Sequence, residues 1–227
     1  MKYVDLNILA DTPSAVQDLT SLGEAIGYSG LAIAGLDPTQ YSTPSTIDLF
    51  PRFDAQAKRL SALKKELAKV QGKYLVHAVP LGGVETANWA AEEPLVDILT
   101  LLPSEKERLR KTTARLAAKN DTALEVPIQP LLYTHGLNRS RILKEMTDAI
   151  KIALQCDMRV VLTSGAGAPL QLRSPYAMTH IGMFLGLSQA KAVESISENP
   201  LAIIERNIRR FDDRFVRPGL EIVGETE

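Results

Sequence analysis

Short apolar segments alternate with longer segments of helical periodicity along most of the chain. Apolar residues in the longer segments recur every three or four positions, as in Val16, Leu19, Leu22 and Ile26. Strict alternation of strands and helices predicts parallel strands joined by right-handed crossovers. The short segments are bounded by glycine or polar residues and predict six buried strands: 3–9, 30–35, 73–81, 96–102, 122–128 and 159–165.

Apolar strands covered on both faces occur in α/β barrels and in doubly wound sheets. No glycine-rich dinucleotide-binding sequence follows a predicted strand, so nothing favours the doubly wound sheet. We therefore predict one (β/α) barrel of the TIM type over residues 1–211. The barrel is complete or incomplete, because the sequence predicts only six clear strands. An acidic, flexible tail is expected over 212–227, and the polar segment 37–51 is predicted to be a long loop.

The charge distribution is uneven although the net charge of the 227 residues is only −1. Residues 1–56 hold two basic and seven acidic side chains, whereas residues 57–119 hold twelve basic and seven acidic ones. Residues 138–173 hold six basic and three acidic side chains. Clustered cations can form a local phosphate-binding face on a nearly neutral protein. For residues 57–119, lysine-rich helix faces exposed to solvent explain the excess of basic side chains equally well.

Few residues have the types and spacing of a catalytic centre. The three histidines, His77, His135 and His180, have no paired spacing, so we expect no metal and no catalytic residue in this chain. The alternative is a metal-dependent phosphoesterase that uses Asp5, Asn7 and His135 at the mouth of the barrel. No apolar run is long enough to cross a membrane, and the single cysteine, Cys156, predicts a cytoplasmic protein.

Arginines stand where two predicted helices begin. With Asn138 as the predicted N-cap, Arg139 and Arg141 fall in a first turn, where the helix dipole disfavours cations by about 0.3–1 kcal/mol. Arg173 directly precedes the helix that starts at Ser174. A bound phosphate would reverse the penalty; otherwise the arginines turn into solvent or pair with carboxylates.

The loop after the last predicted strand adds a second feature for anion binding. Residues 164–167 (Ser-Gly-Ala-Gly) offer free backbone N–H groups near Arg173, so Ser164 is also a candidate RNA- or partner-binding residue.

Three sequence blocks together resemble a known family. They are VDLNI (4–8), PLLY (130–133) followed by Arg139, and VVLTSGAGAPLQLRSPYAMTHIGMFLGLSQAKAVESIS (160–197). The chain resembles protein component 3 of ribonuclease P, the TIM-barrel-like subunit of the archaeal and eukaryotic enzymes, over most of residues 2–205. It departs from the family at 87–93, where arginines are expected and none occurs.

The resemblance implies a barrel related to the polymerase-and-histidinol-phosphatase (PHP) metal hydrolases, with the histidine ligands lost. It implies that the RNA subunit and its Mg²⁺ ions remove the 5′ leader of precursor tRNA, and that this chain carries no cofactor. Expected partners are the ribonuclease P RNA, a second small protein subunit and, in the holoenzyme, precursor tRNA. By motif position, Arg139, Arg173 and Lys191 are implied RNA or partner contacts, followed by Lys144 and Arg159.

Overall fold

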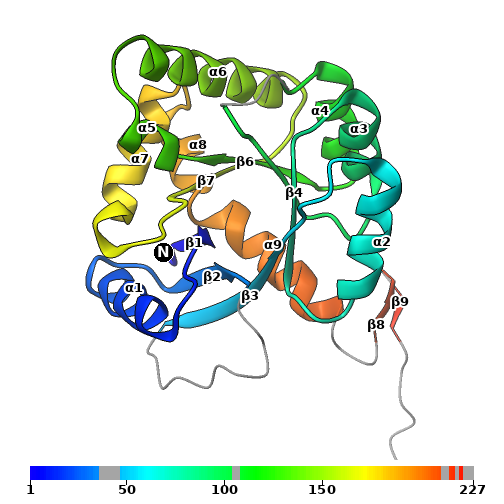
Figure 1. Ribbon diagram of the computed structural model, residues 1–227, viewed down its shortest axis with the longest axis horizontal. Coiled ribbons are helices and arrows are strands. Elements are labelled where there is room, and N and C mark those ends of the chain that lie inside the picture. Colours follow the sequence, from blue (N-terminus) through cyan, green and yellow to red (C-terminus); the bar gives the residue numbers. More distant parts are fainter. Residues whose placement is uncertain (36–46, 104–107, 211–214, 218–219, 222–227) are drawn as a thin grey trace, which may run out of the picture.

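The computed structural model describes residues 1–35, 47–103, 108–210, 215–217 and 220–221. Parallel strands run in sequence order around a barrel (Figure 1). The barrel closes where the Leu9 amide donates to the Ala166 carbonyl at 2.8 Å, beside a parallel bridge between Ile8 and Ala166. The predicted barrel is therefore confirmed. Its seven strands are β1 (Val4–Ile8), β2 (Gly30–Ala34), β3 (Asp48–Asp54), β4 (Val76–Pro80), β5 (Ile98–Thr100), β6 (Ala123–Pro127) and β7 (Val160–Thr163).

Helices surround the strands, and local sequence sets several of their starts. Thr12 Oγ1 accepts the Ala15 amide at 3.2 Å at one helix start, where Pro13 is the first helical residue. In the described part of the chain, no helix is long and apolar enough to span a bilayer. The helices are α1 (Pro13–Ala25), α2 (Leu60–Val70), α3 (Val84–Glu92), α4 (Lys111–Lys119), α5 (Gln129–Tyr133), α6 (Gly136–Gln155), the 3₁₀ turn η1 (Pro169–Gln171), α7 (Pro175–Phe184), α8 (Gln189–Glu194) and α9 (Glu198–Arg210).

Strand β3 corrects the prediction of a loop over 37–51, of which residues 37–46 lie outside the described residues. Residues 48–51 belong to β3, which pairs with β2 and β4. The polar composition of the segment had favoured a loop, and Pro51 cannot donate a hydrogen bond to a sheet. Here the ladder uses the Pro51 carbonyl, which accepts the Leu75 amide at 2.9 Å. After α9, a short antiparallel hairpin joins β8 (Phe215–Arg217) to β9 (Leu220–Glu221), within the segment expected to be a tail.

Helix α9 closes the barrel at the N-terminal ends of its strands (Figure 1). Ile203 and Ile204 of α9 pack against inward-facing strand residues such as Val4 and Val76. Asn207 Nδ2 donates to the Leu75 carbonyl at 2.8 Å, just before β4. The C-terminal mouth, which forms the working surface in TIM barrels, therefore lies at the opposite end from this plug.

An ion pair between the partly exposed Arg206 and the buried Asp97 holds the plug in place. Arg206 Nη2 lies 2.7 Å from Oδ1 of Asp97, whose carboxylate is fully buried, and Oδ2 of Asp97 accepts the His77 amide at 2.9 Å. Arg206 Nη1 also donates to the Asp121 carbonyl at 3.0 Å. One side chain thus joins α9 to the starts of β5 and β6.

Substituting Arg206→Met should leave the Asp97 carboxylate buried with its main cationic partner removed. We expect the free energy of unfolding to fall by about 2–4 kcal/mol. Arg209→Met, at an exposed position of the same helix, should change it by less than about 0.5 kcal/mol. Urea unfolding of both variants would measure the difference, and equal effects would contradict this role of Arg206.

Candidate functional site

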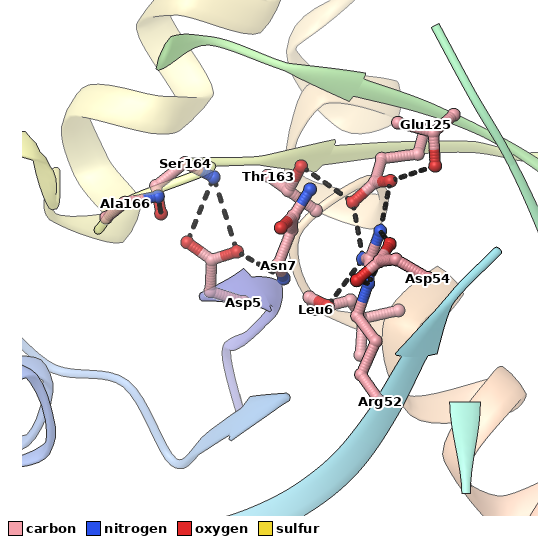
Figure 2. A network of polar contacts seen from close by, with 10 residues as sticks. Asp5, Leu6, Asn7, Arg52, Asp54, Glu125, Thr163, Ser164 and Ala166 are labelled. Carbon is pink, nitrogen blue, oxygen red and sulfur yellow. Dashed lines mark hydrogen bonds and ion pairs between the residues drawn. The ribbon is translucent and has the colours of Figure 1, made fainter. Parts of the chain in front are cut away.

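A fully buried arginine crosses the interior of the barrel near its C-terminal mouth (Figure 2). Arg52 Nη1 donates to Glu125 Oε1 at 2.7 Å and to the Leu6 carbonyl at 2.6 Å. Arg52 Nη2 donates to Glu125 Oε2 and to Asp54 Oδ1, both at 2.7 Å, and Nε donates to Asp54 at 3.0 Å. A guanidinium has five N–H donors, and this arrangement provides an acceptor for each of them.

The carboxylate of Glu125 is equally saturated. Besides Arg52, its oxygens accept hydroxyl donors from Thr100 at 2.6 Å and Thr163 at 2.9 Å, which lie on the two neighbouring strands. Burial raises the pKa of Glu125, but the charge of Arg52 and these hydrogen bonds outweigh it and hold the pKa below its usual range. Burial lowers the pKa of Arg52, whereas the carboxylates raise it above its ordinary value. Both groups are therefore charged at neutral pH.

Asp5 closes the seam between β1 and β7 (Figure 2). Its carboxylate accepts the Ser164 amide at 3.0 Å and the Asn7 amide at 3.1 Å. Burial raises the pKa of Asp5 to about 6, against the hydrogen bonds from Ser164 and Asn7. The Ser164 side chain is fully buried, and its Oγ accepts the Ala166 amide at 3.1 Å. Ser164, a predicted contact, is therefore inaccessible here and shapes the turn after β7.

The residues of the alternative metal site do not converge. His135 precedes α6 and is exposed, whereas Asp5 is buried and bonded to backbone amides. Asn7 Oδ1 is buried without a hydrogen-bond partner among the described residues, but one amide oxygen is a weak ligand. In the described ranges, no three His, Cys, Asp or Glu side chains are grouped so that they could hold a metal ion. These residues do not fit the centre of a metal hydrolase.

The structure corrects the predicted start of the helix that carries Arg139. Helix α6 begins at Gly136 with His135 as its N-cap, so Asn138 lies inside it and Arg141 falls in its second turn. The preceding α5, which was not predicted, places the chain so that Gly136 turns directly into α6 with a φ of 56°. Sequence spacing did not reveal this turn, because Asn138 is also a good cap.

Arg139 and Arg173 bond to backbone carbonyls. Arg139 Nε donates to the Thr134 carbonyl at 2.6 Å, and Arg173 Nη1 donates to the Leu170 carbonyl at 2.7 Å. Neither guanidinium pairs with a carboxylate within the described ranges. The carbonyls offset part of the helix-dipole penalty without a bound anion, and the two positive charges remain uncompensated.

The other predicted contacts already hold surface ion pairs. Such exposed pairs contribute about 0–1 kcal/mol and exchange readily for another anion. Arg159 and Lys191 also line one pocket of about 210 Å³ near the start of β7, away from Arg139 and Arg173, which follow the strand ends. The pairs are Lys144 with Asp148 at 2.9 Å, Arg159 with Asp121 at 3.4 Å and Lys191 with Glu194 at 2.6 Å.

The sequence analysis missed the central residue of the lumen. Arg52 lies in the segment DLFPRFD, whose proline and aspartates hid a strand. One signal was present: Lys2 and Arg52 are the only basic residues before position 57. Nothing in the sequence pairs Arg52 with Glu125, which is 73 positions away.

Removing one charge of the Arg52–Glu125 pair leaves the other charge buried without its partner, so the two single substitutions should not be additive in the free energy of unfolding. Glu125→Gln leaves a buried guanidinium with too little negative charge, and we expect a loss of about 3–5 kcal/mol in unfolding free energy. Adding Arg52→Met to this variant should cost less than the sum of the two single substitutions, by about 1–3 kcal/mol. Denaturant unfolding of the four proteins measures this coupling, and strict additivity would refute it.

The titration of Asp5 should reduce stability as the pH rises. Its raised pKa, about 6 against 3.8, means that the folded protein binds this proton more tightly than the unfolded chain does. The contribution of Asp5 to the free energy of unfolding should therefore fall by an amount on the order of 3 kcal/mol between about pH 4 and pH 6. Above pH 6 it should stay constant. Unfolding of the wild type and Asp5→Asn at several pH values measures it, and a pH-independent difference would contradict the assignment.

The sequence matches known proteins over nearly its whole length. The family RNase P subunit p30 matches residues 2–212. Ribonuclease P protein component 3 of Methanosarcina barkeri is 33% identical over 234 residues, which cover 99% of this chain and 97% of that protein. The resemblance seen in the sequence blocks is thus confirmed.

Solved structures agree in fold. A chain in the cryo-EM structure of archaeal ribonuclease P with mature tRNA superposes with a TM-score of 0.81 at 21% identity, covering 99% of both chains. Histidinol phosphate phosphatase of Lactococcus lactis, complexed with zinc, L-histidinol and phosphate, gives a TM-score of 0.50 at 8% identity, covering 91% of this chain and 94% of that one. The barrel is therefore similar to that of a metal phosphatase, whereas the sequence match extends over nearly the full length: the chain belongs to the RNase P subunit p30 family.

Proposed function

We propose that this chain is a protein subunit of ribonuclease P, the ribonucleoprotein that removes the 5′ leader of precursor tRNA. In this proposal the chain binds the catalytic RNA and a second small protein subunit, and precursor tRNA enters the complete holoenzyme. The RNA and its Mg²⁺ ions perform the cleavage, so the chain carries no cofactor of its own. The cytoplasmic location expected from the sequence stays a prediction.

Family membership over residues 2–212 carries this proposal. The interior of the barrel supports a non-catalytic role. Barrel enzymes place their reacting groups at the C-terminal mouth, and there Arg52 and Glu125 saturate each other. A carboxylate whose oxygens all accept hydrogen bonds from the protein cannot also act as a base or ligand. The alternative, a phosphoesterase that uses Asp5, is not favoured.

The surface provides cations for an anionic polymer. Arg139 and Arg173 have no carboxylate partner among the described residues and follow strands β6 and β7, so both can reach phosphates. Lys144, Arg159 and Lys191 would exchange an exposed carboxylate for phosphate at little cost. Each phosphate contact releases counterions, so binding should weaken as salt increases.

Replacing the two unpaired arginines should weaken RNA binding in a salt-dependent way. For Arg139→Ala and Arg173→Ala we expect a lower affinity for the ribonuclease P RNA and a log–log salt slope that is smaller by about one per residue. Binding titrations across a range of salt concentrations, together with holoenzyme activity, measure the effect.

Lys65→Ala is the matched control, because Lys65 is an exposed cation on α2 without a carboxylate partner among the described residues. It should leave the affinity and the slope unchanged. If the arginine variants behave like this control, the contacts are wrongly assigned. If the wild-type chain also fails to join the holoenzyme, the proposed function itself is wrong.

A further inference from the structure

The seam between β1 and β7 is built differently from the rest of the barrel. Every other pair of neighbouring strands is joined by a parallel ladder, whereas β1 and β7 meet at one isolated bridge near their C-terminal ends. Nearer their N-terminal ends, the turn between α8 and α9 fills the gap. The Ser195 carbonyl accepts the Leu162 amide of β7, and the Ile196 carbonyl accepts the Val4 amide of β1, both at 3.1 Å.

The carboxylate of Asp5 takes the place of a ladder in the middle of the seam. Both of its oxygens accept the Ser164 amide, at 3.2 and 3.0 Å, and one of them also accepts the Asn7 amide at 3.1 Å. Figure 2 shows the carboxylate facing the Ser164 amide across the seam. Asp5 is only 1% exposed, and Ser164 is completely buried. The contact between β1 and the turn at 164–167 therefore depends on a side chain that can gain or lose a proton.

No cation compensates the charge of an ionised Asp5. Among the described residues, no lysine, arginine or histidine pairs with this carboxylate. Burial, and to a smaller extent the negative charge of Glu125, raises the pKa of Asp5 to about 6 despite the hydrogen bonds from Ser164 and Asn7. The positive charge of Arg52 is already shared between Glu125 and a second carboxylate. The folded protein therefore holds the proton of Asp5 more tightly than water-exposed carboxyl groups hold theirs.

The other elements around Asp5 add no group that changes charge near neutral pH. The segments 160–167 and 195–197 contain no titratable side chain. Tyr28, in the turn before β2, is buried, and burial together with the charge of Asp5 raises its pKa, so its hydroxyl stays neutral. Asp18 and Glu24 of α1 are exposed to solvent. Among the described residues of the seam, Asp5 is thus the group whose charge changes near pH 6.

Asn7 offers an acceptor for the proton of a neutral Asp5. Its Oδ1 atom is buried and has no hydrogen-bond partner among the described residues. A buried acceptor without a donor is unfavourable, and a neutral carboxyl has an O–H donor that a carboxylate lacks. Asn7 follows Asp5 by two positions, and its own amide already donates to that side chain. The unpaired acceptor and the tightly held proton are therefore complementary.

We propose that closure of the seam depends on a proton at Asp5: the neutral carboxyl donates its O–H to Asn7 Oδ1 and keeps Ser164 against β1, and loss of the proton lets the seam open locally. An ionised carboxylate here lacks a counter-charge, and water reaches it only when Ser164 moves away from β1. This inference does not rest on the proposed function, because it concerns the closure of the barrel itself.

Two further contacts limit how far the opening extends. The Leu9 amide donates to the Ala166 carbonyl at 2.8 Å, and the Tyr28 hydroxyl donates to the Arg173 carbonyl at 2.9 Å. Neither bond involves a group that titrates near neutral pH. The proton at Asp5 should therefore control the backbone around Ser164, while the segment that leads to Arg173 stays attached to the first strands.

Two measurements on the full wild-type chain test the proposal. Carbon-13 NMR of the Asp5 carboxyl should give a titration midpoint near pH 6. Amide hydrogen exchange, expressed as protection factors, should show protection of the Ser164 amide falling about tenfold between pH 5 and pH 7, because the open state releases the proton at the ordinary pKa of an aspartate. The Leu101 and Ala123 amides, which lie in the ladders beside β5 and β6, should remain more protected throughout.

Three variants separate the proton from other effects. Asp5→Asn supplies an acceptor and donors without a charge, so the Ser164 amide should keep the same protection from pH 5 to pH 7. Asn7→Ala removes the unpaired acceptor and should lower the titration midpoint of Asp5 by on the order of one pH unit. Asp11→Asn is the matched control, because Asp11 is exposed just after β1, and it should behave as the wild type does.

Each result supports or overturns the proposal. A midpoint of the Asp5 carboxyl below about pH 4.5 would show that the folded protein does not retain this proton. If the Ser164 amide exchanges only as slowly as Leu101 and Ala123 at every pH, the seam does not open locally and the idea fails. An unchanged midpoint in Asn7→Ala would remove Asn7 from it. The wild-type titration and exchange need no substitution, so they decide even where a variant does not fold.

Discussion

The interior of this barrel depends on one buried ion pair. Arg52 and Glu125 lie on strands from opposite parts of the sheet, and their contact crosses the lumen. Moving both charges out of water is costly, and the pair persists because each N–H and each carboxylate oxygen has a partner. Together with Thr100 and Thr163, the pair holds four strands at set positions. Among the described residues of the lumen, the carboxylate of Glu125 is fully occupied by hydrogen bonds from Arg52, Thr100 and Thr163.

The barrel is similar in fold to that of a histidinol phosphate phosphatase complexed with zinc, and in this chain the lumen is occupied by the Arg52–Glu125 pair. In the described part of the chain, no three His, Cys, Asp or Glu side chains are grouped so that they could hold a metal ion; Glu125 is saturated, and His135 and His180 are exposed. At the seam and at the plug, the buried carboxylates of Asp5 and Asp97 likewise accept hydrogen bonds from backbone amides, and Asp97 also pairs with Arg206. Arg139 and Arg173, which have no carboxylate partner among the described residues, instead bond to backbone carbonyls at the surface.

The pattern of apolar positions was sufficient for the barrel and for most element boundaries. Strands at 3–9 and 159–165, and the helix start at Thr12 and Pro13, depend on local preferences that tertiary contacts did not override. β3 was missed because its proline and aspartates are locally typical of a loop, and only pairing on both sides makes it a strand. The N-cap of α6 was misplaced because α5 and Gly136 decide where that helix begins.

The sequence by itself determined the alternation of strands and helices, the family and the clusters of cations at 57–119 and 138–173, because each depends on neighbouring residues or on matching blocks. Only the tertiary structure decided that Arg52 meets Glu125 and that Ser164 is buried. The physical reason is that burial and charge pairing depend on distances between residues far apart in the chain. Local periodicity contains no information about those distances until the barrel closes.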